Sequence, residues 1–98
     1  MSDLNRHFLK DLENYWHCEV RDASSGGDLL RALSHPSHPI SEKNFKDSLA
    51  AAIEHQTIGI KEYEEITGLD FEDASEVVKD LQNLWTMIYG DWELRGQV

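Results

Sequence analysis

The sequence predicts an all-α protein folded as a compact bundle of about four to five helices. Along most of the chain, apolar residues recur at intervals of three and four, which is the spacing of one buried face of an α-helix. No segment shows a strong alternation of apolar and polar residues, although a short strand near the C-terminus stays open. The length of 98 residues fits one domain, 1–98, and three Trp, three Tyr and three Phe supply large side chains for its core.

Two helices are expected in the first forty residues. The first covers residues 3–19, with Ser2 as its N-cap. Its apolar stripe consists of Leu4, Phe8, Leu9, Leu12, Tyr15 and Trp16. Small and flexible residues at 21–27 predict a loop, after which Asp28 caps a short helix that carries Leu29, Leu30 and Leu33. Two prolines in the segment 34–39 end this helix, because proline lacks the N–H that a helix interior needs.

Two further helices are expected in the middle of the chain. Ser41 is placed to cap a helix that ends near Gln56. Its apolar stripe consists of Phe45, Leu49, Ala52 and Ile53. A short helix follows at residues 60–67, and Gly68 is placed to end it in the left-handed conformation that glycine adopts at little cost.

The last helix has the clearest pattern in the sequence. Asp70 is predicted to be its N-cap, with Asp73 at the third helical position, and Gly90 is predicted to end it. Its apolar stripe consists of Phe71, Ala74, Val78, Leu81, Trp85 and Ile88. After it, Trp92 and Leu94 are expected to fold back onto the body of the protein.

The net charge of −10, from 19 acidic and 9 basic residues, favours some classes of partner over others. A nucleic-acid backbone or an anionic membrane surface repels such a chain, whereas a basic protein attracts it. We therefore expect a basic protein partner, no nucleic acid and no membrane. No apolar run approaches the ~18 residues of a membrane span, and no signal peptide is recognised, so we expect a cytoplasmic protein.

The residue pattern predicts no catalytic residue, no metal site and no cofactor. His17 and Cys18 are adjacent, and His35 and His38 follow in a proline-containing loop, but this spacing differs from the paired ligands of structural zinc sites. We expect the two loop histidines to face solvent and Cys18 to be a small buried thiol. No phosphate-binding glycine loop and no nucleophile elbow is present, so the protein is predicted not to be an enzyme.

Residues 60–84 offer one alternative, because a short helix, a turn and a longer helix also form the DNA-binding unit of helix-turn-helix regulators. The charges oppose this function. Residues 60–80 contain eight acids and only two bases, Lys61 and Lys79, a net charge of −6 that phosphates would repel.

The acidic residues are concentrated in the second part of the chain. Residues 1–40 have a net charge of −2, whereas residues 41–98 have a net charge of −8. The last two helices would therefore present a negative surface with an aromatic residue at its edge. The residues predicted to bind a partner there are Glu62, Tyr63, Glu65, Glu72, Asp73, Glu76 and Asp80. Tyr63 also lies on the line from Ile60 to Ile66, so a place in the core stays open for it.

In its size, acidity and helix content the chain resembles the immunity proteins that protect bacteria from their own nuclease toxins, including colicins and contact-dependent inhibition toxins. The resemblance implies an inhibitor that blocks the substrate site of a basic toxin, with carboxylates standing where phosphates would lie. A nucleic-acid mimic that blocks DNA-binding enzymes would use the same physics. An adaptor or oligomerising subunit is a further alternative, and its marker would be an exposed apolar patch formed by Trp85, Trp92 and Leu94.

Overall fold

Five α-helices and no strand are found in the part of the chain that the computed structural model describes, residues 3–22, 24–90 and 92. They are α1 (Asp3–Trp16), α2 (Ser25–Ser34), α3 (Glu42–His55), α4 (Ile60–Thr67) and α5 (Ala74–Tyr89). The predicted all-α fold of four to five helices is therefore confirmed. None of these helices combines the length and the apolar character needed to cross a membrane.

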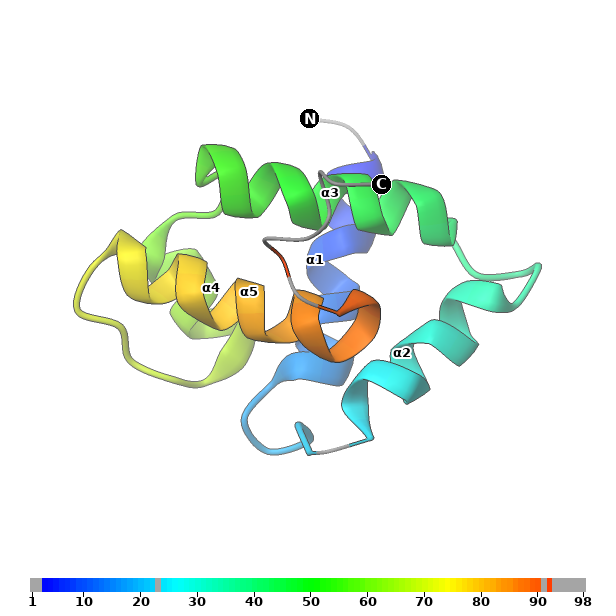
Figure 1. Ribbon diagram of the computed structural model, residues 1–98, viewed down its shortest axis with the longest axis horizontal. Helices are drawn as coiled ribbons and strands as arrows, with labels where there is room; N and C mark the ends of the chain where they lie inside the picture. Colours follow the sequence, from blue (N-terminus) through cyan, green and yellow to red (C-terminus); the bar gives the residue numbers. More distant parts are fainter. Residues whose placement is uncertain (1–2, 23, 91, 93–98) are drawn as a thin grey trace.

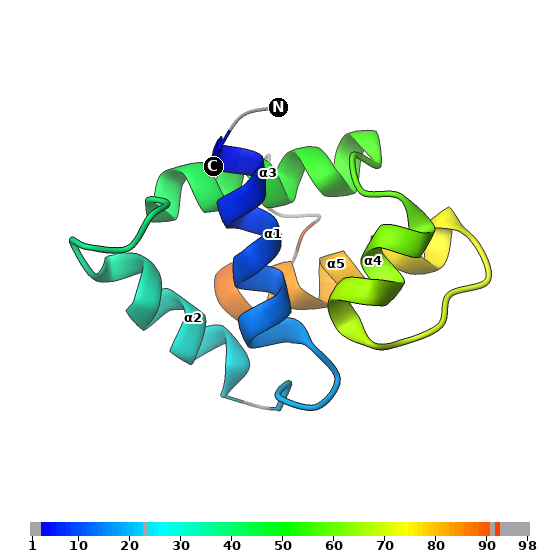
Figure 2. The ribbon, with the colours of Figure 1, turned by 180° about the vertical axis from the view of Figure 1, so that it is seen from behind.

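The first and last helices lie on opposite faces of the molecule (Figures 1 and 2). α5 is in front of α1 in Figure 1, and α1 is in front of α5 in the view from behind in Figure 2. The other three helices surround this pair, and α1 and α5 each pack against all three of them. The chain thus encloses one core between two crossing helices.

All five helices contribute side chains to this core. The residues with at most 1% of their surface exposed include Phe8 and Leu12 from α1, Leu29 from α2, Phe45 and Leu49 from α3, Tyr63 from α4, and Leu81 and Leu84 from α5. Phe8 and Phe45 meet edge to face, with ring centroids 5.2 Å apart. Burial of each large apolar side chain contributes about 1.5–3 kcal/mol, so this cluster is the main source of stability.

Four predicted helix ends, from Ser41 to Gly90, are confirmed. The Ser41 hydroxyl accepts a hydrogen bond from the backbone N–H of Asn44 at 3.2 Å, as an N-cap does. Gln56 ends α3 and Gly68 ends α4, both in the left-handed conformation, and Gly90 ends α5. The predictions for Ser2 and Leu94 fall outside the described residues.

Three predicted helix ends are wrong, and two of them lie in the first part of the chain. α1 ends at Trp16 rather than residue 19, where a turn follows. α2 begins at Ser25 instead of Asp28, because the Asp22 carboxylate binds Ser24 and the Ser25 hydroxyl accepts from the Asp22 backbone N–H. Gly26 then packs directly against Met87 of α5, where an added Cβ would lie 2.7 Å from the Met87 Cγ. This contact explains why Gly26 belongs to a helix.

α5 begins one turn later than predicted. Its N-cap is Asp73, whose carboxylate accepts from the Glu76 backbone N–H at 3.1 Å. Glu76 in turn accepts from the backbone N–H of Glu72, the residue before the N-cap, at 2.7 Å, so both carboxylates bind backbone at the start of α5. Asp70 and Phe71 therefore belong to the loop at 68–73 and not to the helix.

Gly68 is the position at which a single methyl group should do most harm to this loop. Its φ of +75° disfavours other residues, and an added Cβ would lie 2.8 Å from His17 Nε2 and 2.9 Å from Cys18 Sγ. We expect Gly68→Ala to lower the free energy of unfolding by about 1–3 kcal/mol in urea denaturation. Gly27→Ala is the matched control. It adds a methyl group in open space within α2, so we expect it to raise stability by about 0.5–1 kcal/mol. Equal effects of the two substitutions would contradict the proposed clash.

Asp11 is an acidic residue on the buried side of α1. It is 4% exposed, and both of its carboxylate oxygens lie 3.1 Å from Nε2 of His38, which follows α2. Burial raises the pKa of the Asp11 carboxyl above its ordinary value of 3.8, although the hydrogen bond and charge of His38 and the charge of His7 oppose the shift. The ionised form therefore destabilises the fold relative to the neutral form.

This shift predicts how stability depends on pH. Because the folded-state pKa of Asp11 is raised, its contribution is fully present below pH 3.8 and is lost as the pH rises through the folded-state value. We expect the free energy of unfolding of Asp11→Asn, relative to the wild type, to increase by on the order of 1 kcal/mol between pH 3.5 and neutrality. Urea denaturation across this range measures it, with Asp47→Asn, an exposed carboxylate, as a flat control. A difference that stays constant with pH would rule out burial as the cause.

Candidate protein-binding surface

The structure divides the seven residues predicted to bind a partner into three groups. Tyr63 and Asp80 lie inside a hydrogen-bonded network with the end of α1. Glu62 and Glu65 are exposed on α4, beside α1. Glu72, Asp73 and Glu76 are exposed at the beginning of α5. Glu65 also lines a hollow beside the loop at 68–73, so the second and third groups meet at that loop, whereas Tyr63 and Asp80 are bound to each other inside the protein.

Tyr63 and Asp80 belong to a network that joins α1, α4 and α5. Tyr63 is fully buried, and its hydroxyl donates to Asp80 Oδ2 at 2.7 Å. The Trp16 indole N–H lies 3.1 Å from both the Tyr63 hydroxyl and Asp80 Oδ2. Burial, followed by the nearby Asp80 charge, raises the pKa of the Tyr63 phenol far above its ordinary value, so it stays a donor. Tyr63 is a core residue, and its prediction as a partner contact is wrong.

Arg21 supplies the positive charge of this network. Its guanidinium donates two hydrogen bonds to the Asp80 carboxylate, at 2.8 and 3.0 Å, and two more to the Trp16 carbonyl. It also stacks on the Trp16 ring, 3.8 Å from the ring centroid. The Asp80 side chain is only 13% exposed. Arg21 therefore balances the charge of Asp80 inside the protein. Asp80 was predicted to bind a partner protein, and this internal ion pair is contrary to that role.

Glu62 and Glu65 border a groove between α4 and α1. The groove has a volume of about 380 Å³, and Arg6, His7 and Lys10 of α1 line its other side. Charges of both signs therefore face each other across it. Glu13 also lines the groove and pairs with Lys10 at 3.2 Å, so the bases of α1 offset the charges of Glu62 and Glu65 only in part.

The strongest negative charge remains around the loop at 68–73. We call this region the acidic end, and it consists of Glu65, Asp70, Glu72, Asp73 and Glu76, all of which are exposed. Two shallow hollows, of about 280 and 340 Å³, meet there and share Leu69 and Asp70 in their walls. Lys61 and Lys79 line one hollow each. Glu65, Asp70 and Glu76 thus share these hollows with Leu69, which is partly exposed.

Hydrogen bonds hold the acidic end in shape. The Glu64 carboxylate accepts from the Phe71 backbone N–H at 2.8 Å, which ties the loop to α4. Phe71 packs on Tyr63, with ring centroids 5.2 Å apart. Hydrogen bonds from the Ser75 hydroxyl and then from the Glu76 backbone lower the pKa of Asp73, so it is ionised at neutral pH. The loop therefore carries its charges on a fixed backbone.

The structure also differs from the sequence predictions for Cys18, His38 and Trp85. Cys18 is exposed, whereas a buried thiol was expected, and His38 is half-buried against Asp11 rather than facing solvent. Trp85 is 3% exposed and packs edge to face on Trp92 at 4.8 Å, so it cannot belong to an exposed apolar patch. Within the described residues, no three His, Cys, Asp or Glu side chains are grouped as metal ligands would be.

Comparison with known proteins leaves this geometry as the only guide to function. No protein-family model matches the chain, and neither a curated protein nor a solved structure matches it. Inferences about function therefore depend on the charges, contacts and exposure of the described residues.

Proposed function

We propose that this protein binds a basic protein and inhibits it by covering its substrate site. The observation that supports this function most directly is the acidic end, where five carboxylates are exposed and three of them, Glu65, Asp70 and Glu76, line the hollows beside Leu69. A partner with a positive cleft would be attracted to this region over several ångströms, because a concentrated charge steers association. Leu69 would supply apolar contact at the centre of the interface, where charge alone contributes little affinity.

The fixed geometry of the loop favours tight binding. Glu64 ties the loop to α4 through Phe71, and the backbone hydrogen bonds of the Asp73 and Glu76 carboxylates fix the start of α5. A loop that is already ordered loses little conformational freedom on association. Carboxylates held at fixed positions can replace the phosphates of a nucleic acid in a cleft built to bind them. A nuclease toxin, inhibited by an immunity protein of this kind, is the partner that we propose.

Affinity capture from the source cells, with the protein immobilised at low salt, tests this function. We expect a captured protein that is basic, that elutes as the salt concentration rises, and whose activity on nucleic acid falls when the soluble protein is added in equal amount. Duplex DNA at low salt is the second arm. Direct binding to DNA, or a partner that resists high salt and keeps its activity, would overturn the proposal in favour of a regulator or an adaptor.

A further inference from the structure

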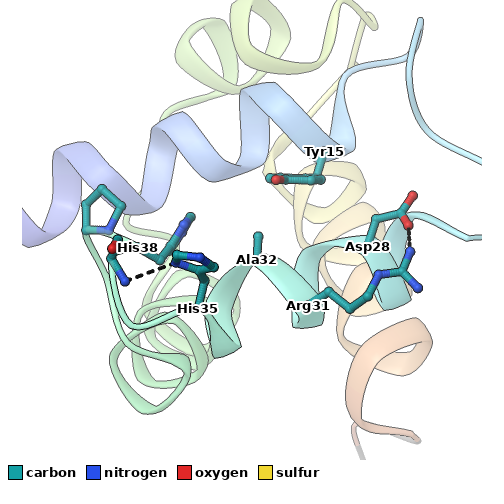
Figure 3. Close-up of a pocket in the computed structure, with 8 residues that line it drawn as sticks. Tyr15, Asp28, Arg31, Ala32, His35 and His38 are labelled. Carbon is teal, nitrogen blue, oxygen red and sulfur yellow. Dashed lines mark hydrogen bonds and ion pairs between the residues drawn. The ribbon is translucent and has the colours of Figure 1, made fainter.

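A second surface of the molecule is chemically unlike the acidic end. It is a groove of about 550 Å³ between the end of α1, the outer side of α2 and the loop that follows α2 (Figure 3). Tyr15 of α1 lies across from Ala32 of α2, while Arg31, His35 and His38 are placed along the groove. We call it the α1–α2 groove. Its volume lies within the range of small-molecule sites in proteins.

The α1–α2 groove offers N–H donors to an anion, although Asp28 offsets the charge of Arg31 and the whole chain carries −10. Arg31 and two histidines line it, and its one acidic lining residue, Asp28, forms an ion pair with Arg31. The hydrogen bond to Asp28 uses one nitrogen of the guanidinium. Because a guanidinium has five N–H donors, the others can bind a second acceptor.

The two histidines are held in defined orientations. Nε2 of His38 faces the carboxylate of Asp11, whose side chain is 6% exposed, so a buried charge positions this imidazole at the end of the groove. Nδ1 of His35 accepts a hydrogen bond from the Ser37 backbone N–H at 3.1 Å. An accepting Nδ1 leaves the proton on Nε2 in the neutral ring, and Nε2–H is then free to donate.

We propose that the α1–α2 groove binds a small molecule that joins an oxyanion, either a carboxylate or a phosphate, to a planar apolar group. Arg31 binds the oxyanion, because its planar N–H donors match the paired oxygens, and His35 lines the groove on the other side of Ala32. The planar group lies against the ring of Tyr15, with Ala32 opposite it. The site is separate from the acidic end and does not depend on the function proposed for that region.

Amide chemical shifts of the full chain, followed during titration at constant ionic strength, test the site. The probes are phenyl phosphate, benzoate and inorganic phosphate. We expect saturable shifts at Tyr15 and residues 28–39, with a Kd of about 1 mM or tighter for phenyl phosphate or benzoate. The probe that binds more tightly, phenyl phosphate or benzoate, shows whether the site prefers a phosphate or a carboxylate. Inorganic phosphate should bind at least about tenfold more weakly, because it cannot contact Tyr15. Shifts that do not saturate would overturn the proposal, as would equal binding of inorganic phosphate.

Two substitutions distinguish this site from general attraction of anions. Arg31→Gln should weaken binding about tenfold or more, because a charged donor is lost. Asp28→Asn should strengthen it several-fold, because it removes the carboxylate that competes for Arg31. Lys43 and Asp47 of α3 form a comparable exposed pair, so Lys43→Gln and Asp47→Asn serve as matched controls and should leave the affinity unchanged. All four positions are at the surface, and urea denaturation checks that the variants fold. Equal effects at the two pairs would overturn the proposal.

Discussion

Asp80→Ala should lower the free energy of unfolding by about 3 kcal/mol, although Asp80 is only one of 19 acidic residues. The Asp80 carboxylate accepts from the Arg21 guanidinium, the Tyr63 hydroxyl and the Trp16 indole. Alanine leaves the buried Tyr63 hydroxyl without this acceptor, and the Trp16 indole and the Arg21 guanidinium keep only their contacts to the Tyr63 hydroxyl and the Trp16 carbonyl. The loss therefore includes the cost of unpaired buried groups as well as the loss of the bonds. Urea denaturation measures it.

A matched exposed residue and a double-mutant cycle test this explanation. Glu62→Ala removes a carboxylate from the surface of α4 and should change stability by no more than about 0.5 kcal/mol. In the cycle, Arg21→Ala and Asp80→Ala should be far from additive, because each removes the same ion pair. If Asp80→Ala costs less than 1 kcal/mol, or if the two substitutions add, the network does not hold α1 against α5.

The same network marks the limit of what the sequence could predict. Helices were predictable because their signals are local, and residues 60–67 form α4 as the spacing indicated. The pairing of Arg21 with Asp80 joins residues 59 positions apart, and no local pattern indicates it. Tyr63 fits the buried face of α4 and an interface equally well in a periodicity argument, so only its contacts decide between them.

Two other differences between the predicted and the observed structure could have been foreseen from the sequence. Asp70, Asp73 and Glu76 are spaced by three, so an acidic N-cap fits at either of two registers, and the structure uses the later one, Asp73. Asp11 lies three positions after Phe8 and directly before Leu12, close to the buried face of α1. An acid at such a position predicts a specific partner, and His38 is that partner. The α1–α2 groove had no such signal, because it forms only when α1 and α2 pack together.

Reversing the charge of the acidic end should weaken binding of the proposed basic partner by about 100-fold or more. The variant is Glu65→Lys, Asp70→Lys and Glu72→Lys in one chain. Asp73 and Glu76 are kept because they cap α5, and Asp80 is kept because it is internal. Most of the loss should appear in the association rate, because steering acts before contact is made. The dependence of affinity on salt should become flatter at the same time.

The control must separate a local surface from the effect of total charge. Asp28→Lys, Glu42→Lys and Asp47→Lys make the same change in net charge on α2 and α3, outside the acidic end. If the field of the whole molecule attracts the partner, both triple variants lose affinity equally, and the acidic end is not the binding site. If the partner contacts the acidic end, the control keeps most of its affinity, because charges beyond about 10 Å from the interface are largely screened at physiological salt. The ratio of the two affinities therefore measures how far recognition depends on the position of the carboxylates and not on their number.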